Sequence, residues 1–168
     1  MRVGFCSLTG CSGHEAGRNL LAAIYREETG QEMPNILTTV RGKPFFEHSP
    51  YYFSISHTSR HAFCVLSRTQ VGIDAEELDR TVPFSHAGRI LSPSEFRRFC
   101  VAENPNRAFL AMWVLKEATA KYTGAGLTGC LNTTDFSPDD PRVFLHHGCI
   151  AAIVCQSENK EEITFHDF

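Results

Sequence analysis

Four ionisable residues in two short segments are the strongest candidates for chemistry in this sequence. Asp74 and Glu76 lie two apart in the segment VGIDAE, and Glu117 and Lys121 lie four apart in the segment WVLKEATAK. Side chains two apart on a β-strand point to the same face, so the two carboxylates would lie roughly 6–7 Å apart along the chain. Residues four apart share one face of an α-helix, so Glu117 and Lys121 would also point the same way.

Two carboxylates at that spacing suit one hard cation such as Mg²⁺, and Glu117 is a candidate for a third oxygen ligand. The ordinary alternative is that Asp74 and Glu76 line a solvated strand face, while Glu117 and Lys121 form a helix-surface pair worth about 0.2–0.5 kcal/mol. Each motif by itself favours this alternative. The combination favours a site, because Mg²⁺ held by few carboxylates usually completes its shell with substrate phosphates.

Two further segments offer groups that could contact phosphates. Residues 41–44, RGKP, form a predicted turn with two cations, and residues 56–58, SHT, end a predicted strand. His57 would lie on the side of Phe53 and Ile55, so a core histidine is the alternative to a binding role. Arg18 projects from a predicted helix, and a solvent-facing arginine is the alternative there.

Other polar residues give no ligand pattern. Glu77 and Asp79 follow the candidate strand and are expected to be solvated. The spacing of the remaining histidines matches no recognisable ligand set; they are His14, His48, His61, His86, His146, His147 and His166.

The helix that must position Glu117 and Lys121 follows Asn104. Eight consecutive apolar residues at 108–115, without strand alternation, predict a helix that is buried most of the way round. Residues 104–106 provide a start, and residues 123–124 a stop. Trp113 within it is expected to pack in the core.

The strand that carries Asp74 and Glu76 is the last of three predicted antiparallel strands in a meander, at 51–57, 61–67 and 71–76. On that last strand the apolar residues would face one way and the two acids the other. Further elements are predicted as strands at 1–11, 34–40, 131–136, 142–147 and 149–156, an edge strand at 162–166, a helix at 14–29 and a helix start at 92–95.

This order of elements predicts an α+β fold in a single domain over residues 1–168. We expect two similar α+β lobes, about 1–67 and 68–168, with antiparallel sheets packed on long helices in a pseudo-twofold arrangement.

Composition narrows the function classes. The chain has 168 residues and a net charge of -3, so no overall basic field points to nucleic acid. Its seven cysteines are odd in number and form no CxxC pair, which is typical of reduced thiols and predicts a cytoplasmic protein. No apolar run approaches the ~20 residues that span a bilayer, so no membrane association is expected.

The two main segments resemble the signatures of one enzyme family. VGIDAE at 71–76 is similar to the G-(I/V)-D-x-E signature of 4′-phosphopantetheinyl transferases, and WVLKEATAK at 113–121 is similar to their W-x-x-K-E-(S/A)-x-x-K signature. GKP at 42–44 and SHT at 56–58 match upstream elements of that family in the same order, and AGR at 16–18 resembles its arginine-bearing helix. The match covers roughly residues 14–127.

The resemblance implies a reaction and the residues that carry it. A serine hydroxyl of an apo carrier protein attacks coenzyme A, phosphopantetheine is transferred, and 3′,5′-ADP leaves. Asp74, Glu76 and Glu117 resemble the ligands of Mg²⁺; Glu117 is the candidate general base, and Lys121 would stabilise the leaving phosphate. The residues that would hold coenzyme A are Arg18, Arg41, Lys43, Pro44, Ser56, His57, Lys116 and Lys121.

The resemblance is to the monomeric, two-lobed members with three acids, here with a shortened N-terminal half. A non-catalytic relative that only binds coenzyme A is the alternative, and an interaction protein on the same scaffold is a third possibility. The class of carrier (acyl, polyketide or peptidyl) and the choice between Mg²⁺ and Mn²⁺ stay open.

Overall fold

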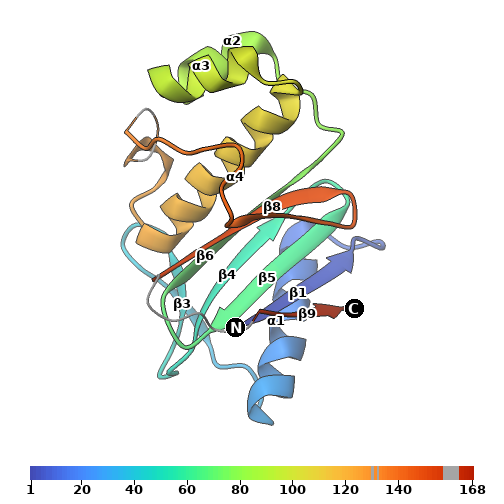
Figure 1. Cartoon of the computed structure of the whole chain (residues 1–168). Coiled ribbons are helices and arrows are strands. Elements are labelled where there is room, and N and C mark those ends of the chain that lie inside the picture. Colours follow the sequence, from blue (N-terminus) through green and yellow to red (C-terminus); the bar gives the residue numbers. More distant parts are fainter. Residues whose placement is uncertain (130, 132, 157–162) are drawn as a thin grey trace.

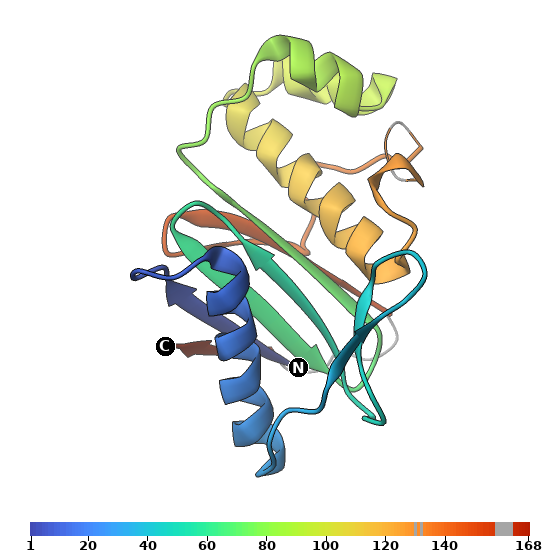
Figure 2. The ribbon, with the colours of Figure 1, turned by 180° about the vertical axis from the view of Figure 1, so that it is seen from behind.

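The structure is a computed structural model that describes residues 1–129, 131, 133–156 and 163–168. It is an α+β fold with two larger sheets, each covered by one long helix (Figures 1 and 2). The first sheet has the strand order β4-β5-β1-β9, and the second has the order β6-β8-β7. The predicted α+β class is therefore confirmed, while the pseudo-twofold relation of two lobes stays a prediction.

The first half of the chain builds most of the first sheet. Its elements are β1 (Arg2–Ser7), α1 (Gly13–Thr29), β2 (Ile36–Thr38), β3 (Pro44–Phe46), β4 (Tyr52–His57) and β5 (His61–Ser67). Helix α1 begins where the Ser12 side chain accepts a hydrogen bond from the Glu15 amide, and it ends at Gly30 in the left-handed conformation. The apolar side of α1 packs on the face of β4 and β5 that is turned away from the second sheet. The residues that meet there in one core cluster include Leu20, Ile24, Cys64 and Leu66.

The second half builds the other sheet and its helices. Its elements are β6 (Val71–Glu77), α2 (Phe84–Ile90), α3 (Pro93–Val101), α4 (Pro105–Thr123), η1 (Leu127–Gly129), β7 (Val143–His146), β8 (Cys149–Cys155) and β9 (Thr164–Asp167). Helix α4 begins at Asn104, whose side chain accepts from the Arg107 amide, and ends at Gly124. The helix is buried through most of its length, as its continuous apolar run predicts.

Alternation along the strands assigns each side chain to a layer. Val71, Ile73 and Ala75 of β6 lie in a core shared with Val3 and Phe63 of the first sheet. The neighbouring residues of β6 face α4 instead, so the acids at 74 and 76 are turned away from the core between the sheets. The faces predicted for this strand are confirmed.

The predicted meander of three strands is wrong in its last member. β4 and β5 pair as expected, but β6 pairs with β8 in the second sheet. Where β4 and β6 lie side by side, the Ser54 and Ser56 hydroxyls accept hydrogen bonds from the backbone N–H groups of Ile73 and Ala75 at 3.1 and 3.2 Å. Side-chain oxygens thus take the place of a backbone ladder along this seam, which hydrophobic alternation does not reveal.

Three smaller elements differ from expectation, one of them only in its pairing. The strand predicted at 131–136 is absent from residues 131 and 133–136, where the Phe136 amide donates to the Glu95 carboxylate instead; residue 132 lies outside the described residues. The edge strand is confirmed as β9, although it pairs parallel with β1 and residue 162 lies outside the described residues. The short strand β3 lies where only a turn was expected.

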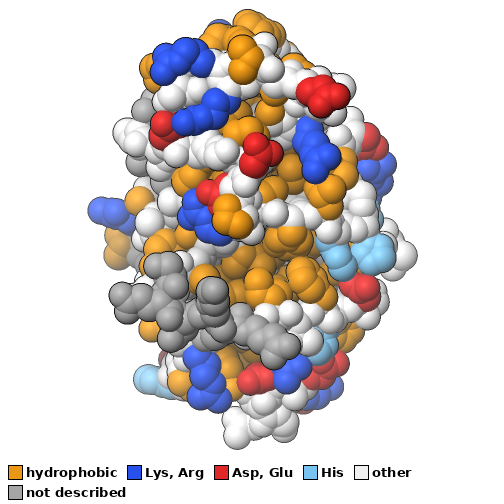
Figure 3. Space-filling view, in the orientation of Figure 1, with side chains coloured by type: hydrophobic (Ala, Val, Ile, Leu, Met, Phe, Trp, Pro, Cys, Tyr) orange, Lys and Arg blue, Asp and Glu red, His pale blue; other side chains and the backbone are white. Residues whose placement is uncertain are grey.

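Surface features agree with the composition. Lys and Arg side chains are interspersed with Asp and Glu on the face shown in Figure 3, without a large patch of one sign. Among the helices that the structure describes, none has the combination of length and apolar composition needed to cross a bilayer.

Close contact between β6 and α4 yields the first prediction. A Cβ atom on Gly72 would lie 2.1 Å from the Ala118 carbonyl oxygen, which belongs to the helix backbone and cannot rotate away. We expect Gly72→Ala to lower the free energy of unfolding by about 1–3 kcal/mol, the cost of overpacking. Chemical denaturation measures this loss.

Gly88→Ala is the matched control, because Gly88 is exposed in α2 and a Cβ there meets only Phe96 at 3.8 Å. This change should be neutral or stabilise the protein by up to about 1 kcal/mol. Equal effects of the two substitutions would contradict the assigned contact between β6 and α4.

Candidate active site

A cleft of about 700 Å³ opens between α4, β4, β6 and the β2–β3 connection. The β2–β3 hairpin reaches the C-terminal end of α4 in both ribbon views (Figures 1 and 2). The ionisable residues that line the cleft are His14, Arg18, Arg41, Lys43, His57, Asp74, Glu76, Glu117 and Lys121. The cleft thus contains all but one of the charged residues that the sequence predicts for the site.

Lys121 of α4 holds the first carboxylate of β6. Its Nζ atom lies 2.7 Å from Asp74 Oδ1 and donates a second hydrogen bond to the Ile55 carbonyl oxygen at 3.3 Å. The Ser56 hydroxyl donates to the same Asp74 oxygen at 2.8 Å. Asp74 is only 6% exposed, and these two donors compensate the burial of its charge.

Glu76, the second acid of the strand, has partners that the sequence did not suggest. Trp113 donates its indole Nε1–H to Glu76 Oε1 at 3.0 Å, and Arg80 forms an ion pair with the same oxygen. Trp113 therefore lines the cleft and is not only a core residue, contrary to expectation. Its position four residues before Glu117 is a signal that could have placed both residues on one helix face.

Glu117 projects from α4 into the cleft between these groups. Burial raises the pKa of Glu117, and the negative charges of Asp74 and Glu76 raise it further. The positive charges of Lys121 and Arg80 lower it, and the resulting pKa is about 7. A carboxyl group whose pKa is raised by desolvation and by two other carboxylates is typical of a functional site.

The three acids of the cleft have the chemistry of a hard-cation site. Together they carry more negative charge than the paired Lys121 and Arg80 neutralise, and Mg²⁺ prefers such carboxylate oxygens. They are not, however, one of the groups of described residues whose ligand atoms all lie within 4.8 Å of one another. The contacts described above engage one oxygen each of Asp74 and Glu76, Oδ1 and Oε1 respectively.

The opposite wall of the cleft carries the cations and the histidine. Arg18 of α1 and His57 at the end of β4 are both exposed and line the cleft, so neither is a core residue. Arg41 and Pro44 line the same wall from the β2–β3 hairpin. Lys43 also lies there, but its ammonium group donates to the Tyr122 carbonyl oxygen at the end of α4, and burial lowers its pKa.

Lys116 is the one predicted binding residue that the structure does not bring to the cleft. Its side chain is fully buried and forms an ion pair with Glu95 of α3, with 2.8 Å between Nζ and Oε2. The Thr134 hydroxyl accepts a further hydrogen bond from it at 2.9 Å. The expected contact between Lys116 and coenzyme A is therefore not supported, because the Lys116 side chain does not reach the cleft.

Comparisons with a family model and with known proteins agree on one family. A family model described as the 4′-phosphopantetheinyl transferase superfamily matches residues 70–163. A protein of Bacillus pumilus named 4′-phosphopantetheinyl transferase psf-1 is 30% identical to this chain, in a match that covers 67% of this chain and 50% of the relative. An L-aminoadipate-semialdehyde dehydrogenase-phosphopantetheinyl transferase of Saccharomyces cerevisiae is 28% identical, over 56% of this chain and 39% of the relative. The chain thus spans half or less of the length of these relatives.

The raised pKa of Glu117 predicts how stability depends on pH. Its pKa rises from 4.5 to about 7 on folding, so the folded state binds more protons than the unfolded state between these values. Stability should therefore fall as pH rises through this window. Thermal unfolding without divalent ions should show Glu117→Gln gaining melting temperature relative to the parent protein between about pH 5 and pH 8.

Glu103→Gln serves as the control for this measurement, because Glu103 is exposed and lies before α4. Its melting temperature should follow that of the parent protein at every pH. If Glu117→Gln also tracks the parent, then Glu117 does not bear the carboxyl with the raised pKa.

The two lysines of the second motif should differ in their effect on stability. Lys116→Met leaves the buried Glu95 carboxylate without its countercharge, and we expect a loss of about 3–5 kcal/mol in the free energy of unfolding. Lys121→Met removes a partner that is 30% exposed from the buried Asp74, which keeps its hydrogen bond from Ser56, so we expect a smaller loss of about 1–2 kcal/mol. Urea denaturation of both variants measures the difference, and equal losses would argue against this distinction.

Proposed function

Because the chain belongs to the 4′-phosphopantetheinyl transferase superfamily, we propose that it transfers 4′-phosphopantetheine from coenzyme A to a serine of an apo carrier protein. The reaction releases 3′,5′-ADP and depends on Mg²⁺. The observation that carries this proposal is the meeting of Asp74, Glu76, Glu117 and Lys121 in one cleft, from a strand and a helix about forty residues apart.

The acids of the cleft would hold the metal and receive the proton. Asp74, Glu76 and Glu117 would bind Mg²⁺, which when bound neutralises charge on a diphosphate. Glu117 accepts the proton of the serine hydroxyl, directly or through a water molecule. The pKa of about 7 belongs to the metal-free site, and bound Mg²⁺ would lower it, so the position of the carboxylate matters more for this role than its basicity.

Lys121 would act on the leaving group. Its ammonium lies against Asp74 and the Ile55 carbonyl, so its position is fixed before the substrate arrives. Charge that develops on the departing phosphate oxygen is then stabilised by a donor that needs little reorganisation. Ser56 supports this arrangement by donating to the same Asp74 oxygen as Lys121.

The opposite wall would bind coenzyme A. Arg18 and Arg41 offer guanidinium groups suited to bidentate capture of phosphate. His57, Lys43 and Pro44 line the same wall and complete a surface for the nucleotide. A cleft of about 700 Å³ is within the usual range for cofactor sites.

The remaining features are proposed on the resemblance and the composition. The molecule acts as a monomer in the cytoplasm, and its two α+β lobes, about 1–67 and 68–168, enclose coenzyme A between them. The carrier is of the acyl, polyketide or peptidyl type. A relative that binds coenzyme A without transfer is the alternative, and the filled set of acids and Lys121 argues against it.

Intact-protein mass spectrometry tests the transfer directly. Incubation with coenzyme A, Mg²⁺ and several apo carrier proteins should add the mass of phosphopantetheine to at least one carrier. Glu117→Gln should lower kcat by about 10²–10⁴-fold, the usual contribution of a general base, and Glu103→Gln should leave it unchanged. Calorimetry should show that the parent protein binds coenzyme A.

Binding of coenzyme A without any mass gain would favour the non-catalytic alternative. A fully active Glu117→Gln variant would remove Glu117 from the role of base while leaving the transferase assignment intact.

A further inference from the structure

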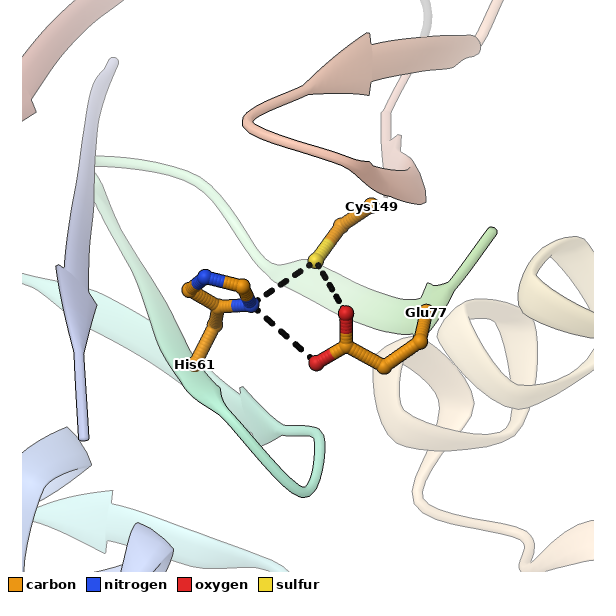
Figure 4. Close-up of side chains that lie close together, drawn as sticks. All are labelled: His61, Glu77 and Cys149. Atoms are coloured by element: carbon orange, nitrogen blue, oxygen red, sulfur yellow. Dashed lines mark hydrogen bonds and ion pairs between the residues drawn. The ribbon is translucent and has the colours of Figure 1, made fainter. Parts of the chain in front are cut away.

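A second group of potential ligands lies outside the cleft, at the ends of three strands. His61 begins β5, Glu77 ends β6 and Cys149 begins β8 (Figure 4). His61 Nδ1 lies 3.1 Å from Glu77 Oε1 and 3.3 Å from Cys149 Sγ, and Sγ lies 3.6 Å from Glu77 Oε2. None of the three residues lines the cleft.

The expectation that Glu77 is a solvated acid is therefore wrong. Glu77 is 5% exposed and Cys149 is fully buried, while His61 is partly accessible. Burial acts to raise the pKa of Glu77, but hydrogen bonds from Arg60, Thr58 and His61 lower it to about 2. The carboxylate is thus charged and held in a fixed orientation toward the other two side chains.

The separations between these atoms match those around a zinc ion. Zinc in a tetrahedral site lies roughly 2.0–2.3 Å from nitrogen, oxygen and sulfur ligands, which puts neighbouring ligand atoms about 3.3–3.6 Å apart. The observed separations are 3.3 Å between Nδ1 and Sγ, 3.1 Å between Nδ1 and Oε1, and 3.6 Å between Sγ and Oε2, so each side chain lies at such a distance, with the two carboxylate oxygens facing one ligand each. One ligand atom from each residue lies within 4.8 Å of the other two. An imidazole, a thiol and a carboxylate also form a donor set that favours zinc over Mg²⁺.

The surrounding charges would balance a divalent cation. Arg60 donates to Glu77 at 2.7 Å and to both oxygens of Asp79 at 2.8 Å. With Cys149 as a thiolate, these three anionic groups and one guanidinium would sum to a charge of about −2, which one Zn²⁺ neutralises. The Arg60 side chain is half exposed, so it could remain on Asp79 while its bond to Glu77 is released.

We infer that His61, Glu77 and Cys149 bind one zinc ion that links the first sheet, through β5, to the second sheet, through β6 and β8. On binding, the Cys149 S–H bond breaks, an S–Zn bond forms and one proton passes to solvent. A water molecule takes the remaining coordination position. The ion would hold the two sheets together, and this role is independent of the proposed transferase activity.

The thiol keeps its proton until the ion arrives. Burial raises the pKa of Cys149 to about 12, and the negative charge of Glu77 contributes to that rise. Zinc deprotonates a coordinating thiol outright, so binding should release about one proton per ion.

Cobalt(II) in place of zinc tests the ligand set in the full-length protein. Titration of the metal-free protein should produce thiolate-to-cobalt charge-transfer absorption in the near ultraviolet, together with the visible bands of a tetrahedral ion. Cys149→Ser should abolish the charge-transfer absorption. Cys100→Ser, which changes an exposed cysteine on α3, should leave it unchanged.

Zinc should also raise the melting temperature of the parent protein and of Cys100→Ser, but not that of Cys149→Ser. X-ray absorption at the zinc edge of the parent protein provides a measurement that does not depend on a variant folding. It should show one sulfur neighbour, and a shell without sulfur would overturn the proposal.

The same measurements distinguish this site from a second possible metal site. His146, His147 and Asp167 form another group with ligand atoms within 4.8 Å of one another, but it is more exposed and contains no sulfur. If cobalt produced no charge-transfer absorption and its binding were lost in His147→Gln, the ion would belong to that exposed group. Absorption that persists in Cys149→Ser would equally overturn the assignment.

Discussion

The contact between β6 and α4 is the constraint on which the candidate site depends. The backbone of α4 approaches β6 so closely at Gly72 that a Cβ atom would lie 2.1 Å from a helix carbonyl. This approach lets the Lys121 ammonium reach Asp74 at 2.7 Å and brings Glu117 near both acids of the strand. The glycine of the first signature and the lysine of the second are thus two parts of one interface.

Two lysines five residues apart on α4 have different roles, because the helix turns their side chains toward different surroundings. Each residue turns the helix by about 100°, so Lys116 and Glu117 cannot face the same environment. Lys116 points into the core and pairs with Glu95, an interaction that joins α3 to α4. Lys121 faces the cleft on the side of Glu117 and pairs with an acid on another element. One sequence motif therefore contains both a packing residue and candidate catalytic residues.

The parts of the site that follow from local periodicity could be predicted from sequence. Alternation gave the faces of β6, and the spacing of four gave the common face of Glu117 and Lys121. Partners that come from elsewhere could not be predicted in this way. Lys116 pairs with Glu95 from α3, and β6 pairs with β8 while two serine hydroxyls of β4 accept hydrogen bonds from its backbone.

Strand β6 separates two kinds of polar environment through its alternation alone. Asp74 and Glu76 face α4, where Glu117 offers further oxygen ligands, whereas Glu77 faces an imidazole and a thiol. Hard cations bind to oxygen ligands, and nitrogen and sulfur favour zinc, so neighbouring residues of one strand would select different metals. His61 and Cys149 are 88 residues apart in sequence, and no spacing rule unites them with Glu77. The fold alone creates that group, by aligning the ends of three strands.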